Sequence, residues 1–255
     1  MTVCMVQANT KSIFWEIHSG LPREGPGDDE STRKAFLMAD ALPPRARILD
    51  VGAGPGMQTM ELARISDGTI VAVDTHCPFL HELRRRAQDA GVSNCVSAVN
   101  ASMASLPFRS ESFDLLWSEG AIYIMGFRQG LTAWKRFLAP QAYIAVTDAC
   151  WLTTEIPEDV RKHWAEYPGM TTIEITQRII RECGYREVGH FALPDASWWN
   201  DYYHPLEQRL KALRDKYQDE PDALRQVDEA QHEIDMHRKH AHLYGYVFFV
   251  MQKMS

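Results

Sequence analysis

The sequence predicts an α/β fold: a Rossmann-like, mostly parallel sheet of seven strands with helices on both faces and a helical, aromatic-rich cap. Short apolar runs alternate with amphipathic helical stretches between residues 30 and 150. A glycine-rich turn follows the first run, and aromatic residues accumulate after residue 150. Alternating strands and helices are typical of a parallel sheet, because each parallel connection must cross over one face of the sheet.

The expected strands are short apolar runs that end at turn residues. The first, ARILDVG, is closed by Gly52, and the second, TIVAVD, ends in an acid. The last, YGYVFFVMQK, closes the chain after a helical insertion. The expected strands are residues 46–52, 69–74, 95–102, 112–120, 142–150, 186–194 and 244–253.

Helix-capping and helix-breaking residues indicate where the expected helices begin and end. Asp28 or Asp29 can cap the first helix, which ends near residue 41 before two prolines. Gly91 lies at the end of the third helix. Between residues 205 and 241, apolar residues at helical spacing give two segments with one apolar face each. The other expected helices are residues 57–65, 78–91, 127–139 and 171–185.

We expect residues 1–255 to form one domain with three kinds of segment. Residues 1–30 are predicted to be an N-terminal lid, because their glycines and Pro22 and Pro26 precede the first helix of the core. Residues 30–150 are predicted to be the ligand-binding core. Residues 151–170 and 195–242, which are rich in aromatic and helical stretches, are predicted to be cap insertions.

The composition is that of an acidic globular protein with a net charge of −7. Nucleic-acid binders usually carry a basic stripe, whereas Arg84–Arg86, the densest basic run, suits a solvated helix face. No apolar run approaches the ~20 residues of a membrane helix, and the N-terminus lacks a signal-peptide pattern. Five scattered cysteines without a CxxC motif suggest free thiols. We therefore expect a cytoplasmic monomer or homodimer that contacts neither nucleic acid nor a membrane.

The stretch DVGAGPGMQT, residues 50–59, carries the strongest functional signal. No Lys-Ser or Lys-Thr pair follows its glycines, so it is not a Walker loop. It gives GxGxG rather than the dinucleotide pattern GxGxxG, because Met57 occupies the last position. Asp50 just before the turn suits a cationic ligand, and Asp74, about 20 residues beyond the glycines, can accept hydrogen bonds from both ribose hydroxyls. Together these features predict an adenosine-like ligand without a phosphate group.

The motifs ILDVGAGPG, VAVD and LPFRSESFDLLWSEGAIY resemble those of the class I S-adenosylmethionine-dependent methyltransferases. The chain is most similar to the small-molecule group that includes the ubiquinone and menaquinone C-methyltransferases, and IHSGLPREGPG resembles the start of a bacterial subgroup. The resemblance covers residues 30–150. It implies a methyltransferase domain with S-adenosylmethionine as cofactor and S-adenosylhomocysteine as product.

The resemblance also assigns roles to residues of the core. The glycines would let the backbone approach the methionine part, Asp74 would hold the ribose, Ser102 and Met103 would flank the adenine, and Ser118 and Glu119 would face the methionine part and the methyl group. The implied cofactor-binding residues are Asp50, Gly52, Gly54, Gly56, Gln58, Asp74, Thr75, Ser102, Met103, Ser118 and Glu119.

Methyl transfer from a sulfonium is an in-line displacement with a good leaving group, so the enzyme mainly aligns the reactants. An acceptor that must lose a proton also needs a base, and Glu119, Tyr123, His190 and His204 are the candidates, with Glu119 and Tyr123 preferred. No metal site is expected. His232, His237, His240 and His242 lack the HExxH pattern, and we expect Cys77, Cys95, Cys150 and Cys183 to be packing residues rather than ligands of a metalloid.

Aromatic residues outside the core suggest an apolar acceptor pocket over the methyl group. The residues predicted to line it are Trp15, Tyr123, Trp151, Trp198, Tyr202 and Tyr203. The alternative is that these side chains only pack the cap.

The sequence therefore predicts methyl transfer to a small-molecule acceptor. An enzyme that modifies RNA or protein, and a non-catalytic cofactor-binding regulator, stay open as alternatives. The acceptor atom, whether oxygen, nitrogen, carbon, sulfur or a metalloid, is not identified.

Overall fold

The computed structural model describes residues 13–167 and 169–254. Its centre is a sheet with the strand order β3-β2-β1-β4-β5-β8-β7, and the short strand β6 pairs with β5 off this path. β8 is antiparallel to both neighbours, and the other described pairings are parallel. The strands are β1 (Arg47–Val51), β2 (Thr69–Asp74), β3 (Val96–Asn100), β4 (Phe113–Ser118), β5 (Leu138–Trp151), β6 (Thr171–Thr172), β7 (Tyr185–Ala192) and β8 (Tyr244–Lys253).

This sheet confirms the predicted α/β architecture. Every predicted strand is present, and the additional strand β6 has only two residues. β5 begins at Leu138, within the stretch predicted to be helical, because the helix there ends in a 3₁₀ turn at Phe137.

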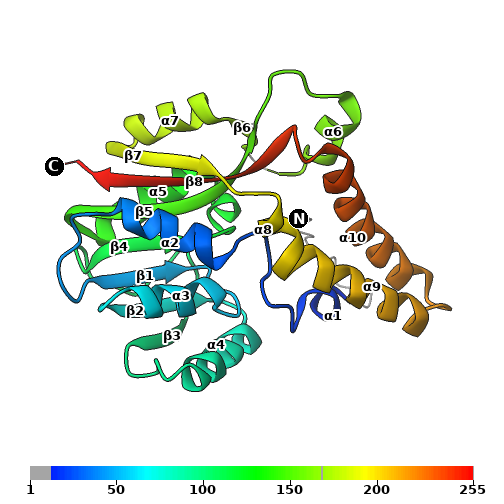
Figure 1. Cartoon of the computed structure of the whole chain (residues 1–255), viewed down its shortest axis with the longest axis horizontal. Coiled ribbons are helices and arrows are strands. Elements are labelled where there is room, and N and C mark those ends of the chain that lie inside the picture. Colours follow the sequence, from blue (N-terminus) through cyan, green and yellow to red (C-terminus); the bar gives the residue numbers. More distant parts are fainter. Residues whose placement is uncertain (1–12, 168, 255) are drawn as a thin grey trace.

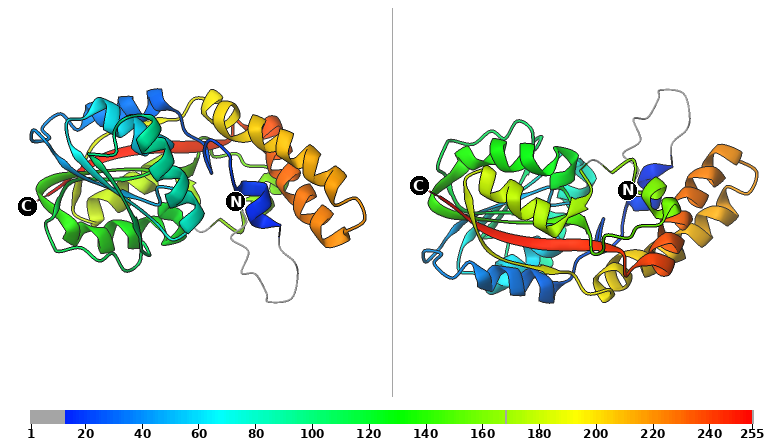
Figure 2. Two further views of the ribbon diagram at one scale, coloured as in Figure 1. Left: turned by 90° about the horizontal axis from the view of Figure 1, so that it is seen from below. Right: turned by 90° about the horizontal axis from the view of Figure 1, so that it is seen from above.

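The helices form a layer on each face of the sheet (Figure 2). On one face, α2 and α3 share a core with α4, which includes Ala35, Leu62 and Leu83. On the other face, α5 and α7 share a core that includes Leu131 and Ile180. The helices are α1 (Phe14–His18), α2 (Asp29–Met38), α3 (Met57–Ile65), α4 (Cys77–Asp89), α5 (Phe127–Trp134), α6 (Glu158–His163), α7 (Ile173–Glu182), α8 (Ala196–Trp198), α9 (His204–Lys216) and α10 (Pro221–His240), with 3₁₀ turns η1 (Ile122–Ile124) and η2 (Lys135–Phe137) and a π-helical turn η3 (Trp199–Tyr203).

Local chemistry explains where α2 and α3 begin. Asp28 is the N-cap of α2, and its carboxylate accepts from the backbone N–H of Ser31 at 2.7 Å, as capping aspartates do. Gly56 precedes α3 with a φ of +89°, a left-handed conformation that glycine adopts at little cost.

The cap stands beyond the carboxyl ends of the strands (Figure 1). α9 and α10 lie side by side there, and α1 packs against α9. The side chain of Arg209 donates to the carbonyl of Glu16 at 2.9 Å, and the Tyr217 hydroxyl donates to the Glu16 carboxylate at 2.6 Å. The sequence did not predict α1, a helix of five residues, or the short helices α6 and α8. Residues 1–12 of the predicted lid lie outside the described residues.

None of the helices in the described part of the chain combines the length and apolarity that a membrane-spanning segment requires.

Candidate active site

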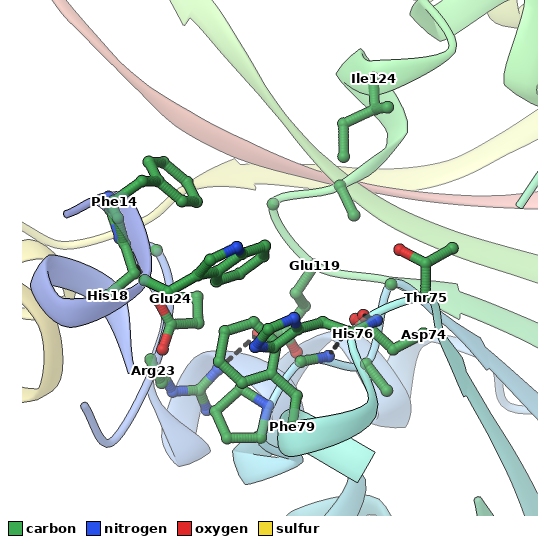
Figure 3. A pocket seen from close by; sticks show the side chains of 18 of the residues that line it. Phe14, His18, Arg23, Glu24, Asp74, Thr75, His76, Phe79, Glu119 and Ile124 are labelled. Atoms are coloured by element: carbon green, nitrogen blue, oxygen red, sulfur yellow. Dashed lines mark hydrogen bonds and ion pairs between the residues drawn. The ribbon is translucent and has the colours of Figure 1, made fainter. Parts of the chain in front are cut away.

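A cavity of about 900 Å³ opens at the carboxyl ends of β1, β2 and β4. Ligands of open α/β sheets bind at this edge, where the strand order reverses; here the reversal lies between β1 and β4. Small-molecule sites span roughly 300–1,000 Å³, so this cavity is a large one. Figure 3 shows walls from the N-terminal segment, the connection after β2 and the turn after β4, and α10 contributes a further side.

The three glycines of the turn after β1 do different things. Gly52 and Gly54 line the cavity with φ values of +74° and +55°. A Cβ on Gly54 would meet its nearest atom, Glu24 Cγ, only at 4.0 Å, so this residue leaves open space on the cavity side. A Cβ on Gly56 would lie 2.6 Å from Cγ of Leu83 on α4. The structure therefore places Gly56 at a helix contact and not at the cavity wall.

Asp74 is the last residue of β2, and its carboxylate holds the glycine turn in place by a hydrogen bond. Its Oδ2 accepts from the N–H of Gly54 at 2.9 Å, and its Oδ1 accepts from the N–H of His76 at 2.8 Å. Asp74 and Thr75 both line the cavity. An ionised carboxylate offers about four acceptor positions, so Asp74 keeps capacity for hydroxyl groups of a ligand.

Asp50 lies under the turn, outside the cavity lining, and is fully buried. The Thr59 hydroxyl donates to its Oδ2 at 2.6 Å, and Gln58 Nε2 donates at 3.3 Å. Burial raises the pKa of Asp50 to about 7, although the Thr59 hydrogen bond opposes this effect. Gln58 does reach the cavity and also donates to the carbonyl of Ala53 at 3.0 Å. Asp50 therefore contacts Thr59 and Gln58 beneath the turn, and of these three residues only Gln58 lines the cavity.

Glu119, just after β4, lines the cavity but accepts from three donors. They are Arg23 Nη1 at 2.9 Å, the Thr32 hydroxyl at 2.7 Å and the indole N–H of Trp117 at 2.9 Å. Its side chain is only 4% exposed. The structure thus ties the Glu119 carboxylate to the N-terminal segment, to α2 and to the end of β4.

Comparison with known proteins gives the same picture of the core. Residues 48–141 match the family model described as "Methyltransferase domain". The dimethylglycine N-methyltransferase of Parasynechococcus marenigrum is 32% identical over 139 residues, which cover 52% of this chain and 50% of that protein. The 27-O-demethylrifamycin SV methyltransferase of Amycolatopsis mediterranei is 26% identical over 255 residues, which cover 90% of this chain and 88% of that protein.

Residues 48–141 of this chain thus form a methyltransferase domain that resembles those of the class I S-adenosylmethionine-dependent methyltransferases. A methyltransferase of Thiobacillus denitrificans, solved with S-adenosylhomocysteine, has a TM-score of 0.82 at 20% identity, and the match covers 95% of this chain and 98% of that one. At this identity the likeness shows a shared fold.

Two further residues implied by the family pattern lie outside the cavity lining. The hydroxyl of Ser118 donates to the carbonyl of Val51 at 2.9 Å and so joins β4 to β1. The hydroxyl of Ser102 accepts from the N–H of Ala104 at 3.3 Å. Met103 does line the cavity, and its carbonyl accepts from the indole of Trp134 at 2.9 Å.

Tyr123 lies in the cavity wall, stacked on Tyr167 with ring centroids 4.8 Å apart. Burial raises the pKa of Tyr123 to about 12, with Glu233 and Asp148 adding to the shift. Its phenol therefore stays protonated at neutral pH and is better suited to donate a hydrogen bond than to act as a base. The other proposed bases, His190 and His204, lie outside the cavity lining.

Four of the six aromatic residues predicted to line an acceptor pocket are placed behind its wall. Trp198 stacks on His237 at 4.2 Å between ring centroids, and Tyr202 and Tyr203 are both 1% exposed. Trp151 packs edge-on against Tyr244. These four side chains pack the cap, as the alternative interpretation expected. The physical reason is that α8 and η3 turn their aromatic side chains toward β8 and α10.

Trp15 does line the cavity, where it stacks on His76 with centroids 3.6 Å apart. Sequence reasoning missed His76 itself, together with a group of charged or polar wall residues. These are His18, Arg23, Glu24, Arg225, Gln226, Glu229 and Glu233. The only available signal was the Arg23-Glu24 pair inside the glycine-rich N-terminal stretch.

Among residues 13–167 and 169–254, no group of three or more His, Cys, Asp or Glu side chains is placed to hold a metal ion. Cys77, Cys95, Cys150 and Cys183 are all free thiols.

Proposed function

We propose that this methyltransferase transfers a methyl group from S-adenosylmethionine to a small-molecule acceptor by in-line displacement. One observation carries the proposal: a single cavity of about 900 Å³ runs from Asp74 and the glycine turn to α10. That volume accommodates a cofactor and a small acceptor together. The two relatives named above are, by their names, methyltransferases of dimethylglycine and of a rifamycin, which agrees with an acceptor of this class.

The half of the cavity next to the β-sheet is suited to the cofactor. Asp74 would accept from the ribose hydroxyls, and Thr75 and Met103 would flank the adenine. Gly52 and Gly54 would lie against the methionine part. Arg23, whose side chain is 5% exposed, lines the same half, and its Nε is buried without a hydrogen-bond partner among the described residues. We assign this N–H to the carboxylate of the methionine part, because an orphaned buried donor is costly until a ligand satisfies it.

When bound, the cofactor supplies an electrophilic methyl group on a positively charged sulfur. The contribution of the chain is alignment, which is worth up to about 7–11 kcal/mol in well-oriented reactions. The N-terminal segment, residues 13–28, would cover the cavity and exclude water, and residues 151–170 and 195–242 would form the cap. The phenol of Tyr123 would orient the acceptor.

Two other functions are less well supported. Methylation of RNA is disfavoured by the net charge of −7, and a macromolecular acceptor does not fit an enclosed cavity well. A non-catalytic regulator would bind the cofactor without turnover.

The experiment is calorimetric titration with S-adenosylmethionine and S-adenosylhomocysteine, followed by a screen of small-molecule acceptors in which mass spectrometry detects a gain of one methyl group. Binding together with turnover of a small molecule supports the proposal. Cofactor binding with turnover of only RNA or protein, or with no turnover across the screen, would overturn it.

A further inference from the structure

Acidic side chains are prominent among the described residues that line the acceptor half of the cavity. They are Glu24 from the N-terminal segment, and Glu229 and Glu233 from α10. Glu233 already accepts from the Tyr203 hydroxyl at 3.2 Å. Among the described basic side chains of this half, Arg225 has its Nη2 3.4 Å from the Asp222 carboxylate on the solvent side, and the other is His18.

Arg23 adds no free positive charge to this half. Its Nη1 is 2.9 Å from Glu119 and its Nη2 is 3.5 Å from Asp29, so two carboxylates already surround its single charge. The Coulomb field in the cavity is therefore set by the acids, and a partly desolvated site strengthens such a field.

Glu24 is the acid whose surroundings demand a partner. Both carboxylate oxygens are buried, and neither accepts a hydrogen bond from a described residue. The nearest basic side chain is His18, whose Nδ1 lies 3.4 Å from Oε2, outside hydrogen-bond geometry. Burial raises the pKa of Glu24, and His18 only partly offsets that effect. A desolvated carboxylate without full compensation favours a bound cation.

Aromatic side chains lie beside these acids, both in the cavity wall and behind it. Tyr123 lines the cavity, and Tyr202 lies behind it, 1% exposed, with a hydroxyl that makes no hydrogen bond within the described residues. Burial raises the pKa of Tyr202 well above its usual value, and the nearby carboxylates of Glu233 and Glu24 add to the shift. Phe14, next to His18, contributes a further ring to the wall. Figure 3 shows Phe14, His18 and Glu24 coming from the same N-terminal segment. Aromatic faces next to carboxylates are typical of sites for amines and quaternary ammonium groups.

We propose that the methyl acceptor is an amine that binds as a cation between Glu24 and the ring of Tyr123. This inference rests on the proposed methyl transfer and narrows its acceptor class. A protonated amine must first lose one proton, and His18, an imidazole of the cavity wall beside Glu24, can accept it. The neutral nitrogen then forms a bond to the methyl carbon while the carbon–sulfur bond breaks and its electron pair stays on sulfur. The product nitrogen is positively charged, and S-adenosylhomocysteine leaves neutral at sulfur.

The test uses matched probes with ethyl, butyl, cyclohexyl and phenethyl skeletons, each as an amine, an alcohol and a carboxylate. Calorimetry measures their binding to the protein saturated with S-adenosylhomocysteine. Hydrogen bonds and ion pairs to charged groups favour the cation by about ten- to a hundredfold. We expect amines to bind that much more tightly than their alcohol and carboxylate counterparts. Equal affinities, a reversed order, or no amine binding while S-adenosylhomocysteine binds would overturn the proposal.

Substitutions test which residue of the cavity wall causes the preference for amines. Glu24→Gln should reduce the preference for amines by about tenfold, with S-adenosylhomocysteine affinity used to confirm a folded site. Asp219→Asn removes the same charge from an exposed residue outside the cavity and should leave the preference unchanged. A preference that survives Glu24→Gln would overturn the proposal.

The acceptor screen separates this inference from the proposed function. Turnover of an amine supports both. Turnover of alcohols, phenols or carbon acids but not of amines would leave the methyltransferase function intact and overturn the amine assignment. A protein that binds no cofactor would overturn the proposed function first.

Discussion

Arg23 Nη1 lies 2.9 Å from Glu119 Oε2, and the two side chains are 5% and 4% exposed. This buried ion pair joins the segment that covers the cavity to the end of β4, 96 residues later in the chain. The N–H of Gly27 donates to the carbonyl of Ser197 at 3.0 Å, which ties the same segment to the cap. The segment that covers the cavity is thus held both to the sheet and to the cap.

We expect Glu119→Gln to lower both stability and cofactor affinity. Removing Glu119 leaves the buried guanidinium of Arg23 with only the more exposed carboxylate of Asp29, 3.5 Å from Nη2, and breaking a buried ion pair costs up to about 3–5 kcal/mol. Urea unfolding and calorimetry with S-adenosylmethionine measure the two effects. The matched control is Glu182→Gln, which removes an ion pair to Arg128 whose side chains are 50% and 47% exposed; exposed pairs contribute about 0–1 kcal/mol. Equal losses of stability in the two variants would contradict this account of the Arg23–Glu119 pair.

Asp74→Ala should weaken S-adenosylmethionine binding by roughly ten- to a hundredfold, because hydrogen bonds to a charged group contribute about 1.5–3 kcal/mol. Calorimetry measures the affinity, and circular dichroism confirms folding. Asp67→Ala is the control: its carboxylate likewise accepts from a backbone N–H, that of Arg45 at 2.9 Å, but it lies outside the cavity lining. A folded Asp74→Ala protein with unchanged affinity would rule out Asp74 as a cofactor ligand.

Alanine substitutions at Gly54 and Gly56, two of the three glycines of the turn, should separate an effect on cofactor binding from an effect on folding. Both positions have positive φ, so each substitution carries a similar backbone cost of about 1 kcal/mol. At Gly56 the new Cβ would also press on Leu83, so Gly56→Ala should lower the melting temperature more than Gly54→Ala. At Gly54 the methyl group enters the cavity, so Gly54→Ala should mainly weaken cofactor binding. Thermal melts and titrations of both variants test the expectation, and the opposite ranking of melting temperatures would refute it.

Asp50 should make stability fall as pH rises from about 4 to 7. Its folded pKa is raised to about 7 from 3.8, so the folded state holds more protons than the unfolded state in that window. Stability therefore decreases with pH there, by up to about 1.4 kcal/mol per pH unit, and levels off above pH 7. Urea unfolding between pH 4 and 8 should show this slope for the unmodified protein and a flatter one for Asp50→Asn. In Asp114→Asn, which lacks a carboxylate whose pKa the Arg47 hydrogen bond lowers, the slope between pH 5 and 8 should persist.

Hydrogen exchange should show whether residues 13–28 respond to cofactor binding. We expect S-adenosylhomocysteine to increase protection in residues 13–28, because this segment lines the cavity. Residues 196–204 should change less, since Trp198, Tyr202 and Tyr203 are already buried behind the wall. Protection confined to residues 50–120 would show that the N-terminal segment does not respond to the cofactor.

The sequence by itself determined the sheet, the turn that follows β1 and the acid at the end of β2. These are local properties: the apolar run of Ile48–Val51, the positive φ that Gly52 and Gly54 allow, and the twenty residues between Gly54 and Asp74 all act over short distances along the chain. Parallel strands then bring their carboxyl ends to one edge, so the place of the cofactor site follows from the alternation of strands and helices.

Only the tertiary structure decided which side chains face the cavity. Arg23 and Glu119 meet across 96 residues, and Glu24 from the N-terminal segment lines the same cavity as Glu233 from α10. Trp198 and Tyr202 are aromatic in the same way as Trp15, yet they pack behind the wall, because the packing of α8 and η3 against β8 and α10 sets where these side chains lie. Residue type reports what a side chain can do, whereas packing between distant elements determines what it touches.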